Sequence, residues 1–288
     1  MKICVIGGAN VDVAARAAGL FIAGDSNPGT VTVAPGGVGR NIAHNLTLLG
    51  HRVRLATVFG DDGFGRMLRE NCKATGMDLS LSQTIKGARN ACFVSVGASD
   101  GEMLGGVSDM AITGLMTPEW LEARLGAINE CDAVVADTNL PAETLSLLVG
   151  GCIPPLFIDA VSSAKVARLR VALAASRLPG AGPIAVKCNR IEAEAIGTAG
   201  LSGVDRLYVS LGSEGVEVIE DGVTTPVAPL PVTGIVNTTG AGDALLAGIV
   251  HCGPDAPAPD AAAFGEQCAR FAMLSASAVN ERIKELVK

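Results

Sequence analysis

The chain has 288 residues, of which 49% are hydrophobic and 18% charged, and its formal net charge is −7. A pI near 5.0 leaves no basic excess to neutralise polynucleotide phosphates, so the composition argues against a DNA-binding or RNA-binding role and favours a small ligand. The length suits one large α/β domain.

Eight cysteines are scattered singly along the chain, without a CxxC pair or a nearby histidine cluster. This pattern is typical of reduced core residues rather than of a disulfide framework or a metal site. The first eight residues are strand-like and do not resemble a signal peptide, so we expect a cytoplasmic protein. Mean hydropathy is +0.41, but every apolar run is interrupted before the roughly 20 residues that span a bilayer, so no membrane partner is expected.

Short β-branched runs alternate with amphipathic stretches through most of the chain. The runs predict buried strands at Lys2–Gly7, Val53–Phe59, Asp132–Asp137, Leu156–Asp159, Ile184–Lys187 and Arg206–Leu211. Periodicity and capping residues predict helices at Val38–Leu49, Gly63–Thr75, Pro118–Asn129, Pro141–Leu148, Ala164–Ala175 and Arg190–Ile196. Such alternation is typical of a mostly parallel central sheet with helices on both faces, a three-layer α/β/α sandwich.

Two segments, Leu20–Pro35 and Ala91–Val107, interrupt this alternation with extended, glycine-bounded sequence. We expect these insertions, at about 13–35 and 88–112, to pair as a small β-sheet lid on a single domain that spans 1–288. Two separate surface loops are the alternative. Because a small sheet exposes strand edges and an apolar face, we expect a homodimer through the lid.

The most informative motif runs from Asn237 to Asp243 with the sequence NTTGAGD, and it opens an apolar helical run. Each glycine in a helix costs up to about 1 kcal/mol, so the two glycines indicate that a ligand approaches the backbone closely. The N–H groups of Gly240, Ala241 and Gly242 would bind an anion. Asp243 would accept a proton from a substrate hydroxyl, as phosphoryl transfer requires. The alternative is that Asp243 only complements the helix dipole.

This motif resembles the C-terminal signature of the ribokinase/PfkB carbohydrate kinases, and four further segments agree with that family in order and spacing. Residues 7–12 resemble its first strand and loop, and residues 35–43 resemble its N-terminal glycine signature. The resemblance implies a ribokinase-like fold, with ATP as phosphate donor and Mg²⁺ as the ion. It also implies that the acceptor sugar is held by Asn10, Asp12, Gly36, Gly37 and Asn41.

On the nucleotide side, residues 187–192 resemble the family's Asn-x-x-Glu element, and residues 209–216 resemble its strand and turn against the nucleotide. The resemblance implies a magnesium role for Glu192 through water. It implies nucleotide contacts at Asn189, Ser210, Gly212 and Gly215, and Asn280 is the candidate beside the adenine. Alternatively, Asn189 only caps a helix that carries Glu192 in its first turn. The spacing gives Lys187 no support as a phosphate ligand.

Two positions depart from the ribokinase pattern. Val38 stands where ribokinase has lysine and Arg40 precedes Asn41, so the sugar site is altered and Arg40 is counted among the substrate-binding residues. Asn237 stands where the family commonly has aspartate, which leaves dependence on a monovalent cation open.

The glycine signature, Asn237 and residues 107–112, 137–141 and 159–165 together resemble the pseudouridine kinase branch of the family. The resemblance implies phosphorylation of the 5′-hydroxyl of pseudouridine, with Asn139 at the border of the pocket. Asp109, Asn90 and Ser95 are the candidates for contacting the uracil ring. A kinase of another nucleoside or ribose-like sugar, and a non-catalytic binding relative, are the alternatives.

Overall fold

The computed structural model describes residues 1–100, 102–197 and 202–288. Its centre is an eight-stranded sheet in the order β14-β13-β12-β11-β10-β9-β1-β4. The strands from β12 to β4 run parallel, and β13 and β14 add an antiparallel hairpin. Their bounds are β1 (Lys2–Ile6), β4 (Arg52–Ala56), β9 (Ala133–Asp137), β10 (Leu156–Asp159), β11 (Ile184–Asn189), β12 (Arg206–Ser210), β13 (Val216–Glu220) and β14 (Val223–Val227). The mostly parallel central sheet is confirmed.

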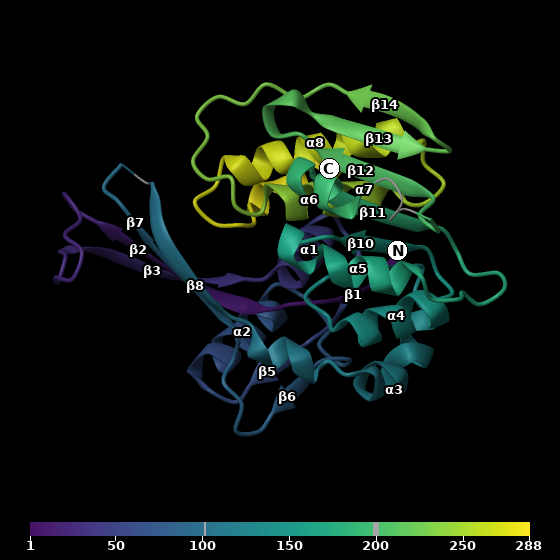
Figure 1. Ribbon diagram of the computed structural model, residues 1–288, viewed down its shortest axis with the longest axis horizontal. Coiled ribbons are helices and arrows are strands. Elements are labelled where there is room, and N and C mark those ends of the chain that lie inside the picture. Colours follow the sequence, from purple (N-terminus) through teal and green to yellow (C-terminus); the bar gives the residue numbers. More distant parts are fainter. Residues whose placement is uncertain (101, 198–201) are drawn as a thin grey trace.

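Helices cover both faces of this sheet (Figure 1). One face carries α1 (Val38–Leu48), α2 (Gly63–Ala74), α7 (Ala241–Cys252) and α8 (Ala258–Met273), and the other carries α3 (Pro118–Asn129), α4 (Ala142–Gly151), α5 (Val166–Leu173) and α6 (Arg190–Ile196). Strand β1 separates the two cores, because Ile3 and Val5 belong to the first and Cys4 and Ile6 to the second. The three-layer sandwich is therefore confirmed.

A separate four-stranded sheet projects from the body of the molecule (Figure 1). It consists of β2 (Asn10–Ala17), β3 (Gly29–Gly36), β7 (Cys92–Gly97) and β8 (Met103–Asp109), in the order β3-β2-β7-β8. The two segments expected to form a small sheet do so. Strand β2 begins earlier than predicted, so Asn10 and Asp12 lie on this second sheet rather than in a loop after β1. That the sheet acts as a lid stays a prediction.

Some boundaries differ from the sequence-based expectation. The prediction of one strand over Val53–Phe59 is wrong, because β4 ends at Ala56 and β5 (Val58–Gly60) pairs instead with β6 (Gln83–Ile85). The backbone carbonyl of Thr57, between the two strands, accepts from Gln83 N at 2.9 Å. The start of α3 was predicted correctly from its capping residue. Thr117 Oγ1 accepts a hydrogen bond from Trp120 N at that point.

The cysteines are distributed as core residues. All eight are free thiols, and six of them are buried. Among the helices of the described residues, none has the length and apolarity needed to cross a membrane.

Candidate functional site

The motif around Asp243 forms a tight turn at the N-terminus of α7. Gly240 has φ 83° and stands just before the helix, and a Cβ there would collide with the backbone carbonyl oxygen of Ala278. Only glycine fits both restraints. The turn leaves the first N–H groups of α7 without helical partners, and the helix dipole adds partial positive charge at the same point. The predicted anion-binding turn therefore has the required backbone shape.

Asp243 lies in the first turn of α7 and is 8% exposed. Burial, followed by repulsion from Asp159, raises the pKa of Asp243 from its ordinary value of 3.8 to about 7. The amide Nδ2 of Asn41, from α1, donates to Oδ2 of Asp243 at 2.8 Å and opposes this shift. A carboxylate with a pKa near neutrality, fixed at one oxygen, is suited to general base catalysis.

Lys187, at the end of β11, places a buried cation beside this turn. Its Nζ lies 3.1 Å from Asp159 Oδ2, and a Cβ on Gly242 would lie 2.6 Å from the same Nζ. Burial lowers the pKa of Lys187, but attraction to Asp159, Asp243 and Glu192 outweighs burial, so the net pKa is raised. The ammonium group is therefore charged and faces the anion-binding turn. No spacing rule connects residues 187 and 242, so a role for Lys187 at the phosphates could not be supported from the sequence.

The residues predicted to hold the sugar come together where the second sheet meets α1. Asn10 Nδ2 donates to Asp12 Oδ1 at 2.6 Å. A Cβ on Gly36 would collide with the Asp12 carboxylate, and Gly37 has φ 100° and packs on the backbone of residues 8–10. Burial raises the pKa of Asp12, although Asn10 and Arg40 favour its charged form. Both glycines therefore allow a close approach that a side chain would block.

Asp137 holds the backbone beside this region through hydrogen bonds. From the sequence, it was named only as part of residues 137–141, which resemble the pseudouridine kinase branch. Asp137 is fully buried at the end of β9, and its Oδ2 accepts from Gly8 N and Gly39 N, each at 2.9 Å. Its Oδ1 accepts from Asn139 N at 2.8 Å. Asn139 Oδ1 in turn accepts from Lys165 Nζ at 2.6 Å. One carboxylate thus joins the ends of two strands to the start of α1.

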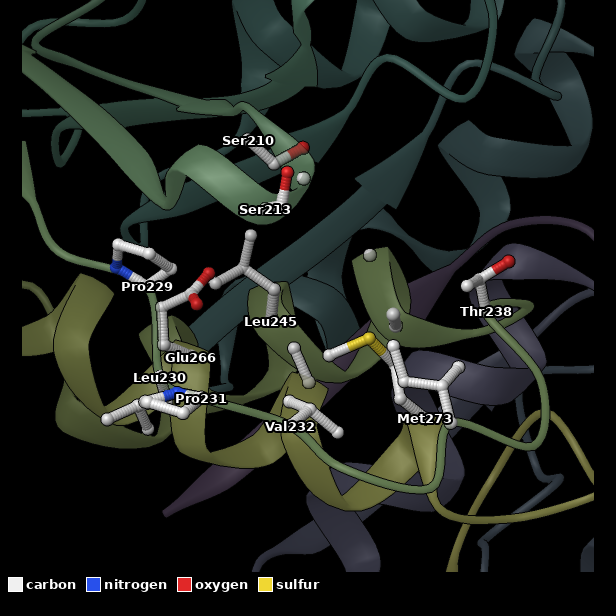
Figure 2. A pocket seen from close by; sticks show the side chains of 15 residues that line it. Ser210, Ser213, Pro229, Leu230, Pro231, Val232, Thr238, Leu245, Glu266 and Met273 are labelled. Atoms are coloured by element: carbon white, nitrogen blue, oxygen red, sulfur yellow. The ribbon is translucent and has the colours of Figure 1, made fainter.

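A cavity of about 440 Å³ opens on the other side of the α7 turn (Figure 2). Thr238 lies on one side of the view and Pro229 and Glu266 on the opposite side, with Leu245 and Met273 between them. The full lining is Ser210, Gly212, Ser213, Pro229, Leu230, Pro231, Val232, Ile235, Thr238, Ala241, Gly242, Leu245, Glu266, Ala269 and Met273. A mostly apolar slot that ends at an anion-binding turn suits a nucleotide.

Of the remaining predicted residues, some line the cavity and others do not. Asn189 and Glu192 form a capping box on α6: Asn189 Oδ1 accepts from Glu192 N at 2.9 Å, and Asn189 N donates to Glu192 Oε2 at 2.8 Å. Ser210 and Gly212 line the cavity, but Gly215 does not, and its φ of 93° shapes the adjoining turn. Asn280 does not line it either, because its side chain bonds to Phe271 O and Arg282 N. Asp109 is exposed on β8.

Comparison with known proteins identifies the family to which this fold belongs. Residues 1–284 match the sequence model of the pfkB family carbohydrate kinases. The chain is 32% identical to a pseudouridine kinase of Escherichia coli, over 94% of this chain and 90% of that protein. Its fold matches a carbohydrate kinase from Agrobacterium tumefaciens with a TM-score of 0.81, at 26% identity and covering 99% and 96% of the two chains. It also matches an Arabidopsis thaliana ribokinase, complexed with ribose and ATP, with a TM-score of 0.81 at 16% identity over 99% and 98% of the chains. The chain therefore belongs to the pfkB family of carbohydrate kinases.

Proposed function

We propose that the protein transfers the γ-phosphoryl group of ATP to the 5′-hydroxyl of pseudouridine. The observation that carries the proposal is the environment of Asp243, which is buried, directly follows Ala241 and Gly242 in the lining of the cavity, and accepts a hydrogen bond from Asn41 of the glycine signature. The similarity to a pseudouridine kinase supports the choice of nucleoside.

In the proposed reaction, Oδ1 of Asp243 accepts the proton of the 5′-hydroxyl while that oxygen attacks the γ-phosphorus. The new bond joins O5′ to phosphorus, the bond from the γ-phosphorus to the β,γ-bridging oxygen breaks, and ADP leaves with that electron pair. The N–H groups at Gly240, Ala241 and Gly242 stabilise the negative charge on the transferring group, and Lys187 adds a full positive charge beside them. Asn10 and Asp12 orient the ribose hydroxyls.

Magnesium fits this arrangement through water rather than through direct protein ligands. No group of three or more His, Cys, Asp or Glu side chains suited to a metal occurs within residues 1–100, 102–197 and 202–288. Glu192 is buried and both its oxygens already accept hydrogen bonds from Asn189. Mg²⁺ keeps several waters and binds mainly to substrate phosphates in kinases. When bound it would neutralise β- and γ-phosphate charge, with Glu192 holding one of its waters.

A substrate panel tests the assignment directly. The purified protein is mixed with ATP and pseudouridine, uridine, adenosine or ribose, and ADP formation is measured over a range of acceptor concentrations. Uridine is the matched control, because it differs from pseudouridine in which ring atom is joined to the ribose. We expect the highest kcat/KM with pseudouridine. Strong turnover of ribose or adenosine with none of pseudouridine would reject the assignment and retain the kinase.

The raised pKa of Asp243 predicts the pH dependence of the reaction. The base acts only when ionised, so kcat/KM should rise with pH to a plateau above about pH 7. At pH 6 it should be about one tenth of the plateau value. Initial rates between pH 5 and 9, in buffers of constant ionic strength, measure this curve. A midpoint near pH 4, the ordinary range of an aspartate, would contradict the raised pKa of Asp243.

We also propose that a second copy of the chain covers the outer face of the second sheet. Val33, Val13, Val94 and Val107 form one row across its four strands, and three of them are 50%, 40% and 72% exposed (Val33, Val94 and Val107). An uncharged row of this kind can pack on a copy of itself. Val107→Asp should yield monomers in light scattering, whereas Thr30→Asp, on the opposite face, should not. A wild-type monomer would refute the proposal.

A further inference from the structure

Arg40 is a buried cation that the proposed chemistry does not use. It is 4% exposed on α1, and among the described residues no carboxylate lies within ion-pair distance of its guanidinium. Its Nε has no hydrogen-bond partner in the described structure. Burying a charge without an ion-pair partner is costly, so its retention needs an explanation.

The guanidinium holds neighbouring side chains instead of facing open space. Nη1 donates to Asn41 Oδ1 at 3.0 Å and, more weakly, to the carbonyl oxygen of Pro35 at 3.4 Å. Nη2 donates to Asn71 Oδ1, on α2, at 2.6 Å and lies 3.3 Å from His44 Nδ1. Burial, followed by the charge of Arg40, lowers the pKa of His44 to about 4, so His44 is neutral and can accept this bond. Arg40 therefore joins α1, α2 and β3.

These contacts determine which way the Asn41 amide points. A guanidinium can only donate hydrogen bonds, so the atom of Asn41 that faces Arg40 must be the oxygen. The amide nitrogen is then directed to Oδ2 of Asp243, at 2.8 Å. Among the described residues this is the one side-chain hydrogen bond that Asp243 makes, and it leaves Oδ1 for the acceptor hydroxyl.

We propose that Arg40 is a positioning residue, which fixes the Asn41 amide so that Oδ2 of Asp243 is held and Oδ1 faces the substrate. This role rests on the proposed function and replaces the expectation that Arg40 contacts the substrate itself. It also accounts for the departure from the ribokinase signature at this position. An arginine next to Asn41 supplies a rigid pair of donors that a small side chain at this position would lack.

Charge gives the proposal a readout beyond loss of activity. Burial lowers the pKa of Arg40, and the Cys72 thiol and the carboxylates of Asp12 and Asp243 only partly oppose this by favouring its charged form. The other charged groups that face Asp243 are Asp159 and Asp137, which raise its pKa, and Lys187, which lowers it. Removing Arg40 therefore leaves Asp243 with less nearby positive charge, and its pKa should rise.

Three variants separate positioning from binding. Arg40→Met keeps a side chain of similar length and removes every hydrogen-bond donor from it. It should lower kcat about 100-fold, and the KM values for ATP and for the nucleoside should each stay within about threefold of wild type. The acidic limb of its pH profile should move to higher pH. Arg40→Lys keeps the charge, so its acidic limb should stay in place and its kcat should be partly restored. Asn71→Leu removes only the outer anchor, and it should lower kcat about tenfold.

Several outcomes would overturn the proposal. A nucleoside KM raised tenfold or more in Arg40→Met with unchanged kcat would mean direct substrate contact. Unchanged kcat in Asn71→Leu would decide against positioning if Arg40→Met fails to fold. In the Asp243→Asn background, Arg40→Met should cause no further loss, and a full additional loss would show that the two residues act independently.

A measurement without substrate keeps this inference distinct from the proposed function. In protein labelled with ¹³C at aspartate carboxyl groups, the resonance assigned to Asp243 should titrate near pH 7 and move to higher pH in Arg40→Met. If that shift occurs while no nucleoside is phosphorylated, the function fails and the positioning of Asp243 stands. If the titration is unchanged while phosphorylation proceeds, the positioning role fails alone.

Discussion

Asp243→Asn should reduce phosphoryl transfer by about 10³-fold or more while the protein stays folded, because the amide cannot accept the hydroxyl proton. Asparagine has nearly the same shape and can still accept the bond from Asn41 Nδ2, which now meets Asp243 Oδ2 at 2.8 Å. ATP affinity should therefore change little. Single-turnover kinetics and ATP titration by calorimetry measure the two quantities separately.

Asp260 provides a matched control. It also lies in the first turn of a helix, α8, but it is exposed and no glycine turn precedes it. Asp260→Asn should leave activity unchanged. If Asp243→Asn retains wild-type activity, or if the two variants lose activity equally, Asp243 is not the base.

Asp243→Asn should increase the stability of the fold although it lowers activity. The folded-state pKa of Asp243 is raised, so protonation stabilises the fold at low pH, and this contribution disappears as pH rises through about 7. A shift of about three pH units corresponds to roughly 4 kcal/mol of unfolding free energy. The variant should thus gain stability relative to wild type between pH 4 and 8, as urea unfolding would measure. The proposed role of Asp243 as the base would explain why the site retains a carboxylate that lowers stability.

Lys187→Met should produce the second large effect, on nucleotide binding. The ammonium lies beside Gly242 in the proposed anion-binding turn, so in the proposed reaction its removal takes a charge-assisted contact from the terminal phosphates. We expect kcat/KM for ATP to fall by about 10²-fold or more, and AMP, which lacks those phosphates, to bind as before. Calorimetric titration of wild type and variant with ATP and with AMP measures the dissociation constant of each ligand.

Because Lys187 forms a buried ion pair with Asp159, Lys187→Met also lowers folding stability and needs a control for that effect. Losing one partner of a buried pair costs about 3–5 kcal/mol, so Lys187→Met is combined with Asp159→Asn to remove the orphaned charge. The double variant should recover folding stability but not ATP affinity. Lys165→Met, which removes a lysine bonded to Asn139 instead, should leave ATP affinity intact. Recovery of ATP binding in the double variant would reduce Lys187 to a structural role.

Features set by local sequence were predictable. The bounds of α6 were predicted as found, because Asn189 and Glu192 form a capping box within four residues. The turn before Asp243 was likewise indicated by its glycines, one of which has the positive φ that glycine favours. The interpretation of Asn189 as a helix cap holds in the structure, whatever further part it has in binding.

Features set by distant contacts were not predictable in this way. Asp137 accepts hydrogen bonds from residues 98 and 129 positions away, and no periodicity connects them. The apolar slot combines Pro229, Leu230, Pro231, Val232 and Ile235, from a segment without strand or helix, with Met273 at the end of α8. The motif predicted Arg40 as a substrate ligand, but only coordinates reveal that its Nη1 and Nη2 atoms donate to the neighbouring side chains of Asn41 and Asn71.

The second sheet also restricts how this chain can change in length. Along β2, Asn10 and Asp12 point to one face, and Val11 and Val13 point to the other. Deleting or inserting one residue in this strand would turn the polar pair toward the core that now buries Val11, and would turn the valines to the opposite face. Homologues should therefore vary freely in the connection of residues 18–28, beyond the last pair of Ala17 with Gly29, yet keep the spacing from residue 10 to 17 constant.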